Sequence, residues 1–143
     1  MKAILKTLAT IVLCLSNLTA AEADAQNVKI KDLSTEFWNK MTAGSFDEAK
    51  KSIFTKGDDP ELENAELFAK MSGDKFDEMV KSLKEFEEKA KLKEAAVKGV
   101  QEQRGREVAF VTMTVWSPKK KAYGKMTIVW LKTKKSEWKI VDM

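Results

Sequence analysis

Residues 107–116 read EVAFVTMTVW, residues 123–132 read YGKMTIVWLK and residues 137–142 read EWKIVD. Side chains alternate between two faces in each stretch, and short polar links separate the stretches. Runs of β-branched and aromatic residues with this period are typical of β-strands. The last third of the chain therefore predicts a three-stranded antiparallel meander. A weaker signal at residues 95–106 indicates a fourth strand.

The segment before these strands has a helical period instead. Apolar residues recur three or four positions apart, and Gly44, Gly57 and Gly73 divide the pattern. Ser45 with Glu48 predicts a capping box, and Asp59 and Asp74 predict further N-caps. The expected helices span residues 32–43, 46–57, 60–71 and 74–90. Helices followed by a meander define the α+β class, with the helices packed on one face of a curved antiparallel sheet.

The helical segments resemble each other at an offset of 30 residues. The tripeptide at residues 46–48 matches the one at residues 76–78, and both read FDE. Two copies are too few to bury a continuous repeat core. The pattern therefore predicts two similar helical hairpins rather than a solenoid.

The N-terminal region has the layout of a secretory signal peptide. Lys2 and Lys6 precede an apolar run at residues 7–15, and small residues follow. Patterns of the A-x-A type end at Ala23 and Ala25, where cleavage is expected. The run is too short to cross a bilayer as a helix. We therefore expect a periplasmic or secreted protein with one mature domain, residues 26–143.

The single cysteine, Cys14, lies inside the apolar run and is expected to leave with it. Leu13 precedes Cys14, whereas a bacterial lipoprotein signal has a small residue at that position. We expect no lipid anchor and a mature domain that is free of thiols. Such a domain is held by its apolar core, because no disulfide can form.

Two further stretches carry a resemblance to a known superfamily. Residues 37–49 read FWNKMTAGSFDEA, and residues 129–142 read VWLKTKKSEWKIVD. Their order and spacing resemble the nuclear transport factor 2-like (cystatin-like cone) superfamily, in particular its small exported bacterial members of unknown function, sometimes called lumazine-binding-like. The resemblance implies a sheet that curls around helices and leaves a cone-shaped cavity. Members use this cavity for catalysis or for small molecules, and many dimerise through the sheet.

Enzymes of that superfamily usually place aspartate, tyrosine or histidine in the cone. This chain has no histidine and one tyrosine. Histidine is also the commonest general base and metal ligand. We therefore predict no catalytic residue, no metal site and no cofactor. An alternative cone-type isomerase or hydrolase would have to use Asp142, Glu107, Glu137 or Tyr123.

An acidic cluster lacks the spacing of a calcium loop, and helix capping accounts for most of it. Its members are Asp58, Asp59, Glu61, Glu63 and Glu66.

Aromatic residues supply the candidate ligand pocket. Pockets for small molecules are mostly apolar with few polar groups. The alternative interpretation is ordinary packing in the core, which we expect for Trp138. The pocket candidates are Phe37, Trp38, Phe110, Trp116 and Trp130.

Lysines concentrate in the two turns of the meander. We expect both turns at one end of the sheet, where they would form a cationic tip for an anionic surface; the alternative is solvated turn residues. No aromatic residue interleaves the lysines, so nucleic-acid binding is not expected. The tip candidates are Lys119, Lys120, Lys121, Lys134 and Lys135.

Three functions remain open at the level of sequence. The first is an exported, non-catalytic module that binds a small apolar ligand or a partner protein in the envelope. The second is a structural or assembly protein that forms a homodimer through its sheet, because residues 107–116 are largely apolar on both faces. The third is the cone-type enzyme described above.

Overall fold

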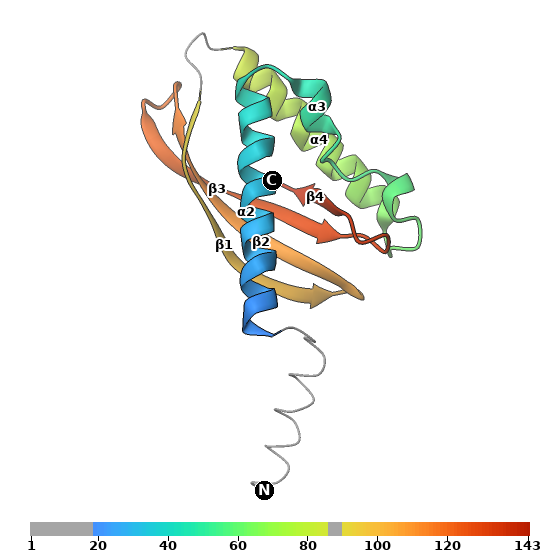
Figure 1. The fold of residues 1–143 in the computed structure, drawn as a ribbon. Helices are drawn as coiled ribbons and strands as arrows, with labels where there is room; N and C mark the ends of the chain where they lie inside the picture. Colours follow the sequence, from blue (N-terminus) through green and yellow to red (C-terminus); the bar gives the residue numbers. More distant parts are fainter. Residues whose placement is uncertain (1–18, 86–89) are drawn as a thin grey trace, which may run out of the picture.

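The computed structural model of the protein describes residues 19–85 and 90–143 (Figure 1). Most of the predicted signal peptide lies outside these residues. The described chain forms the α-helices α2 (Ala20–Thr42), α3 (Phe46–Lys50) and α4 (Ala65–Lys84), with a 3-10 turn η1 (Lys56–Asp58) before α4. It continues as the strands β1 (Lys91–Gln103), β2 (Arg106–Ser117), β3 (Ala122–Lys132) and β4 (Trp138–Asp142). Together these elements confirm the α+β class.

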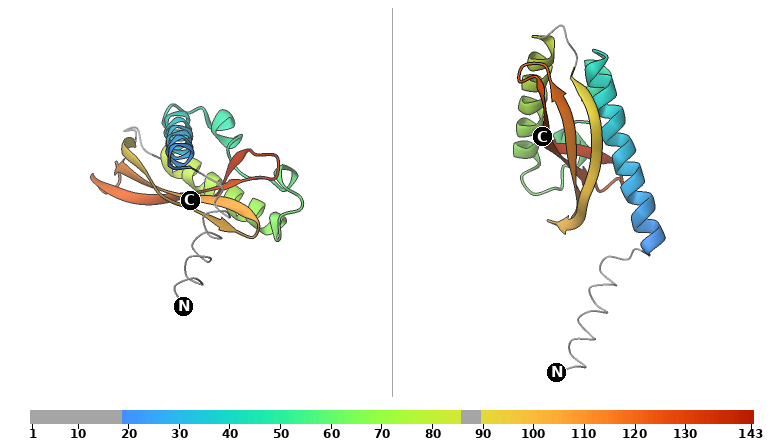
Figure 2. Two further views of the ribbon diagram at one scale, coloured as in Figure 1. Left: turned by 60° about the horizontal axis from the view of Figure 1, so that its bottom comes forward. Right: turned by 90° about the vertical axis from the view of Figure 1, so that its left-hand side faces the viewer.

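The four strands form one antiparallel meander in the order β1-β2-β3-β4. The sheet is curved in Figures 1 and 2. Its first hairpin turns through Arg104 and Gly105, whose φ angles are 53° and 74°. Two consecutive residues with positive φ make a two-residue turn that matches the twist of the flanking strands. From this turn, β1 pairs with β2 as far as Lys91, with two register shifts, although much of β1 is polar and exposed.

Both faces of the sheet are covered by helices, which corrects the expectation of a single covered face. Ala109, Val111 and Met113 of β2 join the core cluster beneath α2. Val108 and Phe110, on the opposite face, pack with residues from the start of α4. Figure 2 shows the strands between α2 and α4 when the sheet is viewed edge-on. The largely apolar character of both faces of residues 107–116 is thus accounted for within one chain.

Helix α4 is a single helix, so the prediction of two helices separated by Gly73 is wrong. A glycine inside a helix costs only about 1 kcal/mol relative to alanine. Packing offsets that cost, because Ser72 and Phe76 are both buried on the same side of the helix. Asp74 lies inside the helix and pairs with Lys70 at 3.6 Å, instead of serving as an N-cap.

The predicted second helix is also shorter than expected. Helix α3 ends at Lys50, and Ser45 makes no side-chain capping bond. Residues 52–54 then run parallel to β4: the amide of Phe54 donates to the carbonyl of Ile140 at 2.9 Å, and the amide of Ile140 donates to the carbonyl of Ser52 at 2.7 Å. The two similar helical hairpins predicted from the 30-residue offset are therefore not present. Residues 52–54 pair with the edge strand β4 instead of continuing as a helix.

Helix α2 begins twelve residues earlier than predicted. Thr19 and Glu22 form a reciprocal capping box at its start, with the amide of Glu22 donating to Oγ1 of Thr19 at 3.2 Å. The first two turns carry no buried residue, and burial begins at Ile30. These turns have no apolar stripe, so a search for apolar periodicity cannot detect them. The predicted cleavage positions lie in these exposed turns, so cleavage there would leave every buried residue of α2 in place.

Candidate functional site

A pocket of about 360 Å³ opens at the end of the sheet formed by the β2–β3 hairpin. Its walls come from the second halves of α2 and α4 and from the hairpin strands. The volume lies within the range of roughly 300–1,000 Å³ typical of small-molecule sites. The apolar part of the lining consists mainly of Trp38, Met79, Leu83, Val115, Trp116 and Met126.

Gly124 keeps part of this pocket open. It lies opposite Val115 in the β2–β3 register, and both residues line the pocket. A Cβ atom added at Gly124 would meet no heavy atom within 4 Å. A larger side chain at this position would therefore extend into free space rather than into the packed core.

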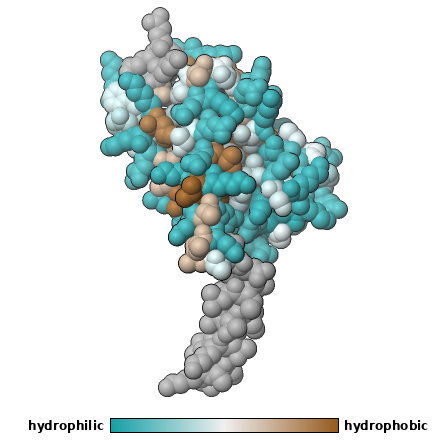
Figure 3. All heavy atoms as spheres, viewed as in Figure 1, coloured by the Kyte–Doolittle hydropathy of each residue, from teal (hydrophilic) through white to brown (hydrophobic). Residues whose placement is uncertain are grey.

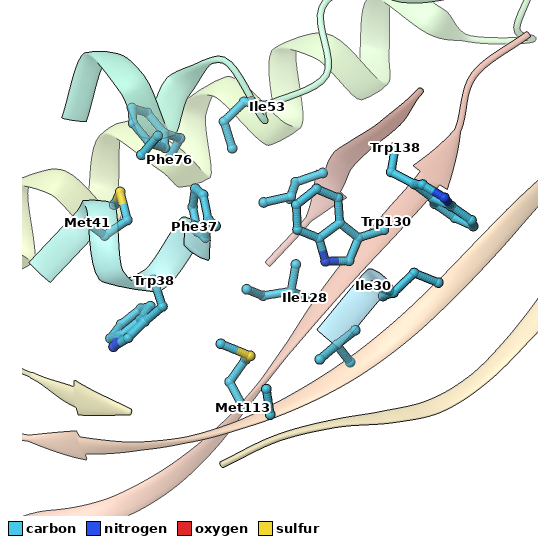
Figure 4. Close-up of a cluster of buried hydrophobic side chains, with 14 of the residues drawn as sticks. Ile30, Phe37, Trp38, Met41, Ile53, Phe76, Met113, Ile128, Trp130 and Trp138 are labelled. Atoms are coloured by element: carbon cyan, nitrogen blue, oxygen red, sulfur yellow. The ribbon is translucent and has the colours of Figure 1, made fainter. Parts of the chain in front are cut away.

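Trp38, one of the lining residues, also carries a buried polar atom without a partner. Its side chain is buried, with 3% of its surface exposed, yet its Nε1 has no hydrogen-bond partner among residues 19–85 and 90–143. In Figure 4 this nitrogen lies at the end of the ring that points away from Phe37 and Trp130. A buried donor without an acceptor costs about 1–3 kcal/mol, so such groups are uncommon in native proteins.

Trp130 shows the ordinary arrangement of a buried indole. Its Nε1 donates to Oγ of Ser34 at 2.8 Å, and Ser34 in turn donates to the carbonyl of Ile30 at 2.8 Å. All three residues are almost completely buried. The chain of two bonds fixes β3 against α2, which gives Trp130 a structural role.

An aromatic pair stands at the rim of the pocket. Trp116 and Tyr123 face each other across β2 and β3, with ring centroids 5.3 Å apart at an interplanar angle of 69°. The Nζ of Lys93 lies 5.2 Å from the centre of the Tyr123 ring. Edge-to-face pairs and cation–π contacts of this kind hold the rim in a defined shape.

The structure separates the five predicted pocket residues into three groups. Trp38 and Trp116 line the pocket described above. Phe37 and Trp130 belong to the buried core, with about 1% of their surfaces exposed. Phe110 lies on the other face of the sheet, where it lines a smaller hollow of about 220 Å³ beside α4.

The pocket also includes residues that the sequence did not single out. Met79, Leu83 and Met126 had the periodicity of core positions, and the same periodicity fits residues that face a cavity. Gly124 carried no distinguishing signal in its strand. Only the convergence of α4 with the hairpin shows that these residues share one pocket.

The two lysine groups lie at opposite ends of the sheet, so the predicted single tip is wrong. Lys119, Lys120 and Lys121 occupy the β2–β3 turn, and Lys134 with Lys135 occupies the β3–β4 turn. Consecutive turns of a meander alternate between the two ends, as Figure 1 shows. Lys119 and Lys120 are exposed and reach the rim of the pocket, where they join Lys125.

Lys134 belongs to an ionic cluster at the far end, which is centred on the buried Asp59. Arg106 binds Asp59 with two bonds, from Nε to Oδ2 at 2.6 Å and from Nη2 to Oδ1 at 3.1 Å. The amide of Lys134 also donates to Asp59 at 3.1 Å, and its Nζ pairs with the exposed Glu61. Asp59 therefore fastens the loop before α4 to β2 and to the β3–β4 turn, which replaces its predicted role as a helix cap.

The same contacts shift the pKa values of this cluster. The hydrogen bond from Arg106 holds the pKa of Asp59 below its ordinary value, and burial partly opposes that effect. The pKa of Arg106 is raised in turn by its bond to Asp59. At the surface, a hydrogen bond from Lys51 lowers the pKa of Glu48. The lowered pKa values of Asp59 and Glu48 are thus explained by ion pairs rather than by a catalytic arrangement.

The acid and base candidates of the alternative enzyme hypothesis are dispersed. Asp142 pairs with Lys75 and lines the small hollow on the second face. Glu107 accepts a bond from Gln26 at 3.1 Å at the far end of the sheet. Of the four candidates, only Tyr123 lines the 360 Å³ pocket, and Glu137 is exposed in a turn. Within the described ranges, no group of three or more acidic, histidine or cysteine residues could hold a metal ion.

A larger hollow of about 770 Å³ lies between the first turns of α2 and the β1–β2 hairpin. Its lining is more polar than that of the smaller pocket, and includes Gln26, Glu107 and Arg104. The polar groups of Gln26 and Glu107 are engaged with each other, and Lys132 approaches Glu107 at 3.4 Å. The smaller pocket is the better candidate site, because its walls are aromatic and apolar.

Comparison with family models, curated proteins and solved structures gave no match. The fold is compatible with the cone-like arrangement that the sequence resemblance implies, since helices pack on a curved, open antiparallel sheet. Among the described helices, none is both long and apolar enough to cross a membrane.

Proposed function

We propose that this protein is an exported, non-catalytic module that binds a small, largely apolar ligand in the pocket at the β2–β3 hairpin. The pocket itself carries the proposal: an apolar and aromatic cavity of about 360 Å³, lined by Trp38 and Trp116. The resemblance to the nuclear transport factor 2-like superfamily supports this function, since some of its members bind small molecules in a cone-shaped cavity.

Export rests on the charged start, apolar run and small residues of the N-terminal segment. Expression in a bacterial host with recovery of the periplasm tests it. We expect a mature chain that begins at Asp24 or Gln26, which intact-mass measurement would show. A chain that stays in the cytoplasm with Met1 or Lys2 at its start would contradict the proposed export.

A neutral fluorescent probe tests ligand binding. N-phenyl-1-naphthylamine is apolar, and its emission rises in an apolar site. We expect saturable binding to the purified protein and at least a tenfold loss of affinity in Gly124→Leu, because the new side chain occupies the pocket. Gly99→Leu is the matched control, since an added Cβ there also meets open space but lies outside this pocket. Equal loss in both variants, or no saturable binding by the unaltered protein, would refute the ligand site.

Homodimerisation through the sheet stays a prediction. The prediction is based on residues 107–116, which are largely apolar on both faces. Helix α4 of the same chain covers Val108 and Phe110 on the second of these faces. The rest of that face carries exposed or half-buried polar residues such as Thr112, Thr114 and Thr127. Figure 3 shows small, scattered apolar areas on the side that carries α2. Light scattering at micromolar concentration would distinguish monomer from dimer.

Binding to an anionic surface is likewise a prediction, now confined to the β2–β3 turn. Lys119, Lys120 and Lys121 are exposed there, without ion-pair partners in the described parts of the chain. Sedimentation with vesicles that contain an anionic lipid at low salt, compared with a variant that reverses these three charges, would test it. Equal sedimentation of the two proteins would dismiss this role.

A further inference from the structure

We infer that a second ligand site lies in the hollow of about 220 Å³ on the second face of the sheet, beside α4. We call it the second-face hollow. Its ligand is a small apolar carboxylate, whose anionic group binds the guanidinium of Arg104. The inference goes beyond the proposed function, because the second-face hollow and the hairpin pocket share no lining residue.

The floor of the second-face hollow is apolar and belongs to the sheet. Two neighbouring cross-strand pairs of β2 and β3 form most of it, and α4 adds a wall on one side. Side chains of this kind favour an apolar ligand body over a polar one. The two floor pairs are Val108 with Leu131 and Phe110 with Val129, and the wall consists of Phe68 and Met71.

The hollow is open to solvent beside α4. Met71 is 40% exposed, and Leu67, four residues earlier on the same helix, is 54% exposed. Residues four apart are neighbours on a helix surface, so the two side chains extend the apolar lining outwards. They are two of the four large apolar side chains that are exposed within residues 19–85 and 90–143. Exposed apolar side chains that gather at one place mark an interaction site.

Arg104 carries the one positive charge among the described lining residues. Its Cζ lies 5.4 Å from the centre of the Phe68 ring, which places the guanidinium at the α4 side of the hollow. It forms no ion pair with a described residue, whereas Arg106 binds Asp59 with two bonds. A guanidinium presents its N–H donors in a planar arrangement that matches the two oxygens of a carboxylate. The charge of Arg104 is therefore held on an aromatic ring and is available to an anion.

The other charged group in the described lining is the carboxylate of Asp142, which pairs with Lys75. Asp142 lies in the row of the sheet that contains Val129 and Phe110. Arg104 lies in the hairpin before β2, six residues before Phe110. The part of β2 between them is about 13 Å long, at about 3.3 Å per residue. The negative charge is thus paired and lies away from Arg104, so a ligand anion is directed to Arg104.

The volume of the hollow limits the ligand to a small body. About 220 Å³ lies below the range of roughly 300–1,000 Å³ that drug-sized ligands occupy. An apolar group the size of a leucine side chain suits such a space, and the methionine in the wall adapts to its shape. The same chemistry occurs in a free branched acid and in the C-terminal residue of a peptide, since both present one carboxylate on a compact apolar body.

A titration followed by nuclear magnetic resonance tests the site. With the methionine methyl groups of the purified protein isotope-labelled, Met71 reports on the second-face hollow, and Met79 and Met126 report on the hairpin pocket. We expect N-acetyl-L-leucine to shift the Met71 signal saturably and to leave the other two unchanged. N-acetyl-L-leucinamide keeps the apolar body without the charge, so it should bind about tenfold more weakly.

A short peptide that ends in leucine distinguishes the two sources of the carboxylate. Tighter binding of this peptide than of N-acetyl-L-leucine assigns the site to a protein C-terminus. Equal or weaker binding assigns the site to a free acid.

Two matched hairpin variants isolate the charge. Arg104 and Lys121 both lie in hairpin turns with positive φ, 53° and 49°, and both are exposed. Asparagine tolerates this backbone conformation, so Arg104→Asn and Lys121→Asn each remove one positive charge and keep the turn. Arg104→Asn should weaken N-acetyl-L-leucine about tenfold and leave the amide unaffected. Lys121 lies outside the hollow, so its variant should change the affinity by less than about twofold.

The outcomes separate this inference from the proposed function. The site is wrong if Met71 shows no saturable shift, if acid and amide bind equally, or if the two variants lose affinity equally. A shift of Met79 and Met126 in place of Met71 would also overturn it. The comparison of acid with amide uses the unaltered protein, so it decides the question even where a variant does not fold. Binding of N-phenyl-1-naphthylamine to the hairpin pocket, and its loss in Gly124→Leu, should be independent of these results.

Discussion

The two ends of the sheet differ in the hydrogen bonding of their buried polar groups. At the β3–β4 end, the buried Asp59 receives two bonds from Arg106 and one from the amide of Lys134. At the β2–β3 end, the buried indole of Trp38 has no acceptor among the described residues, and Lys119 and Lys120 form no ion pair with them. A satisfied buried network stabilises a fold, whereas a buried donor without an acceptor lowers its stability. We therefore expect the paired end to contribute stability, whereas the other end holds the proposed ligand site.

The largest expected loss of stability is at the β3–β4 end, where the buried Asp59 is hydrogen-bonded. Asp59→Ala leaves Arg106 without its partner in a site where only 17% of its side chain is exposed. Breaking a buried ion pair by removing one member is strongly destabilising, and we expect a loss of about 3 kcal/mol in the free energy of unfolding. Urea unfolding followed by fluorescence measures it. A loss below about 1 kcal/mol would show that this network does not hold the loop before α4.

The two buried indoles provide the sharpest internal comparison. Trp130→Phe removes a satisfied donor and leaves Ser34 with one bond fewer, whereas Trp38→Phe removes a donor that has no acceptor among the described residues. We expect Trp130→Phe to reduce stability by about 1–3 kcal/mol more than Trp38→Phe, because both changes remove similar volume and only one breaks a bond. Urea unfolding of the two variants under the same conditions gives the difference. Equal losses would mean that Trp38 is paired in solution.

The pH dependence of stability should reflect Asp59. Its pKa in the folded protein is lowered, first by the hydrogen bond from Arg106, so the unfolded chain binds the proton more readily. The resulting stability is present above the unfolded pKa of about 4 and is lost as the pH falls through the lower folded value.

Unfolding measured between about pH 5 and pH 2 should therefore show a steeper loss in the unaltered protein than in Asp59→Asn. Identical slopes would remove Asp59 as the cause. The change is expected to be smaller than the loss in Asp59→Ala, because protonation retains part of the hydrogen bonding.

The smallest effect is expected where the same network reaches the surface. Glu61→Gln breaks the pair with Lys134, and both side chains are 64% exposed. Exposed ion pairs contribute little, so stability should change by less than about 0.5 kcal/mol. Urea unfolding of Glu61→Gln and Asp59→Ala under the same conditions compares the contributions of an exposed and a buried member of one cluster to the free energy of unfolding. A loss comparable to that of Asp59→Ala would mean that the surface pair anchors the turn.

The helix boundaries show which kinds of sequence signal were reliable. Gly73 and Asp74 have the composition of a helix break, yet α4 continues through them because Ser72 and Phe76 are buried against the rest of the fold. The start of α2 has no apolar stripe, so its helix was missed before residue 32. Strand β1 was only weakly visible, since most of it is exposed and its pairing depends on the turn at Arg104 and Gly105.

The sequence by itself determined the α+β class, the antiparallel meander and the aromatic supply, because periodicity and turn composition act locally along the chain. Only the tertiary structure decided that Trp38 and Trp116 share a pocket while Phe37 and Trp130 fill the core. It also separated the two groups of lysines and brought Arg106 to Asp59 across 47 positions of sequence. A buried side chain and a pocket-lining side chain have the same pattern in sequence, and they differ only in whether another element reaches them in space.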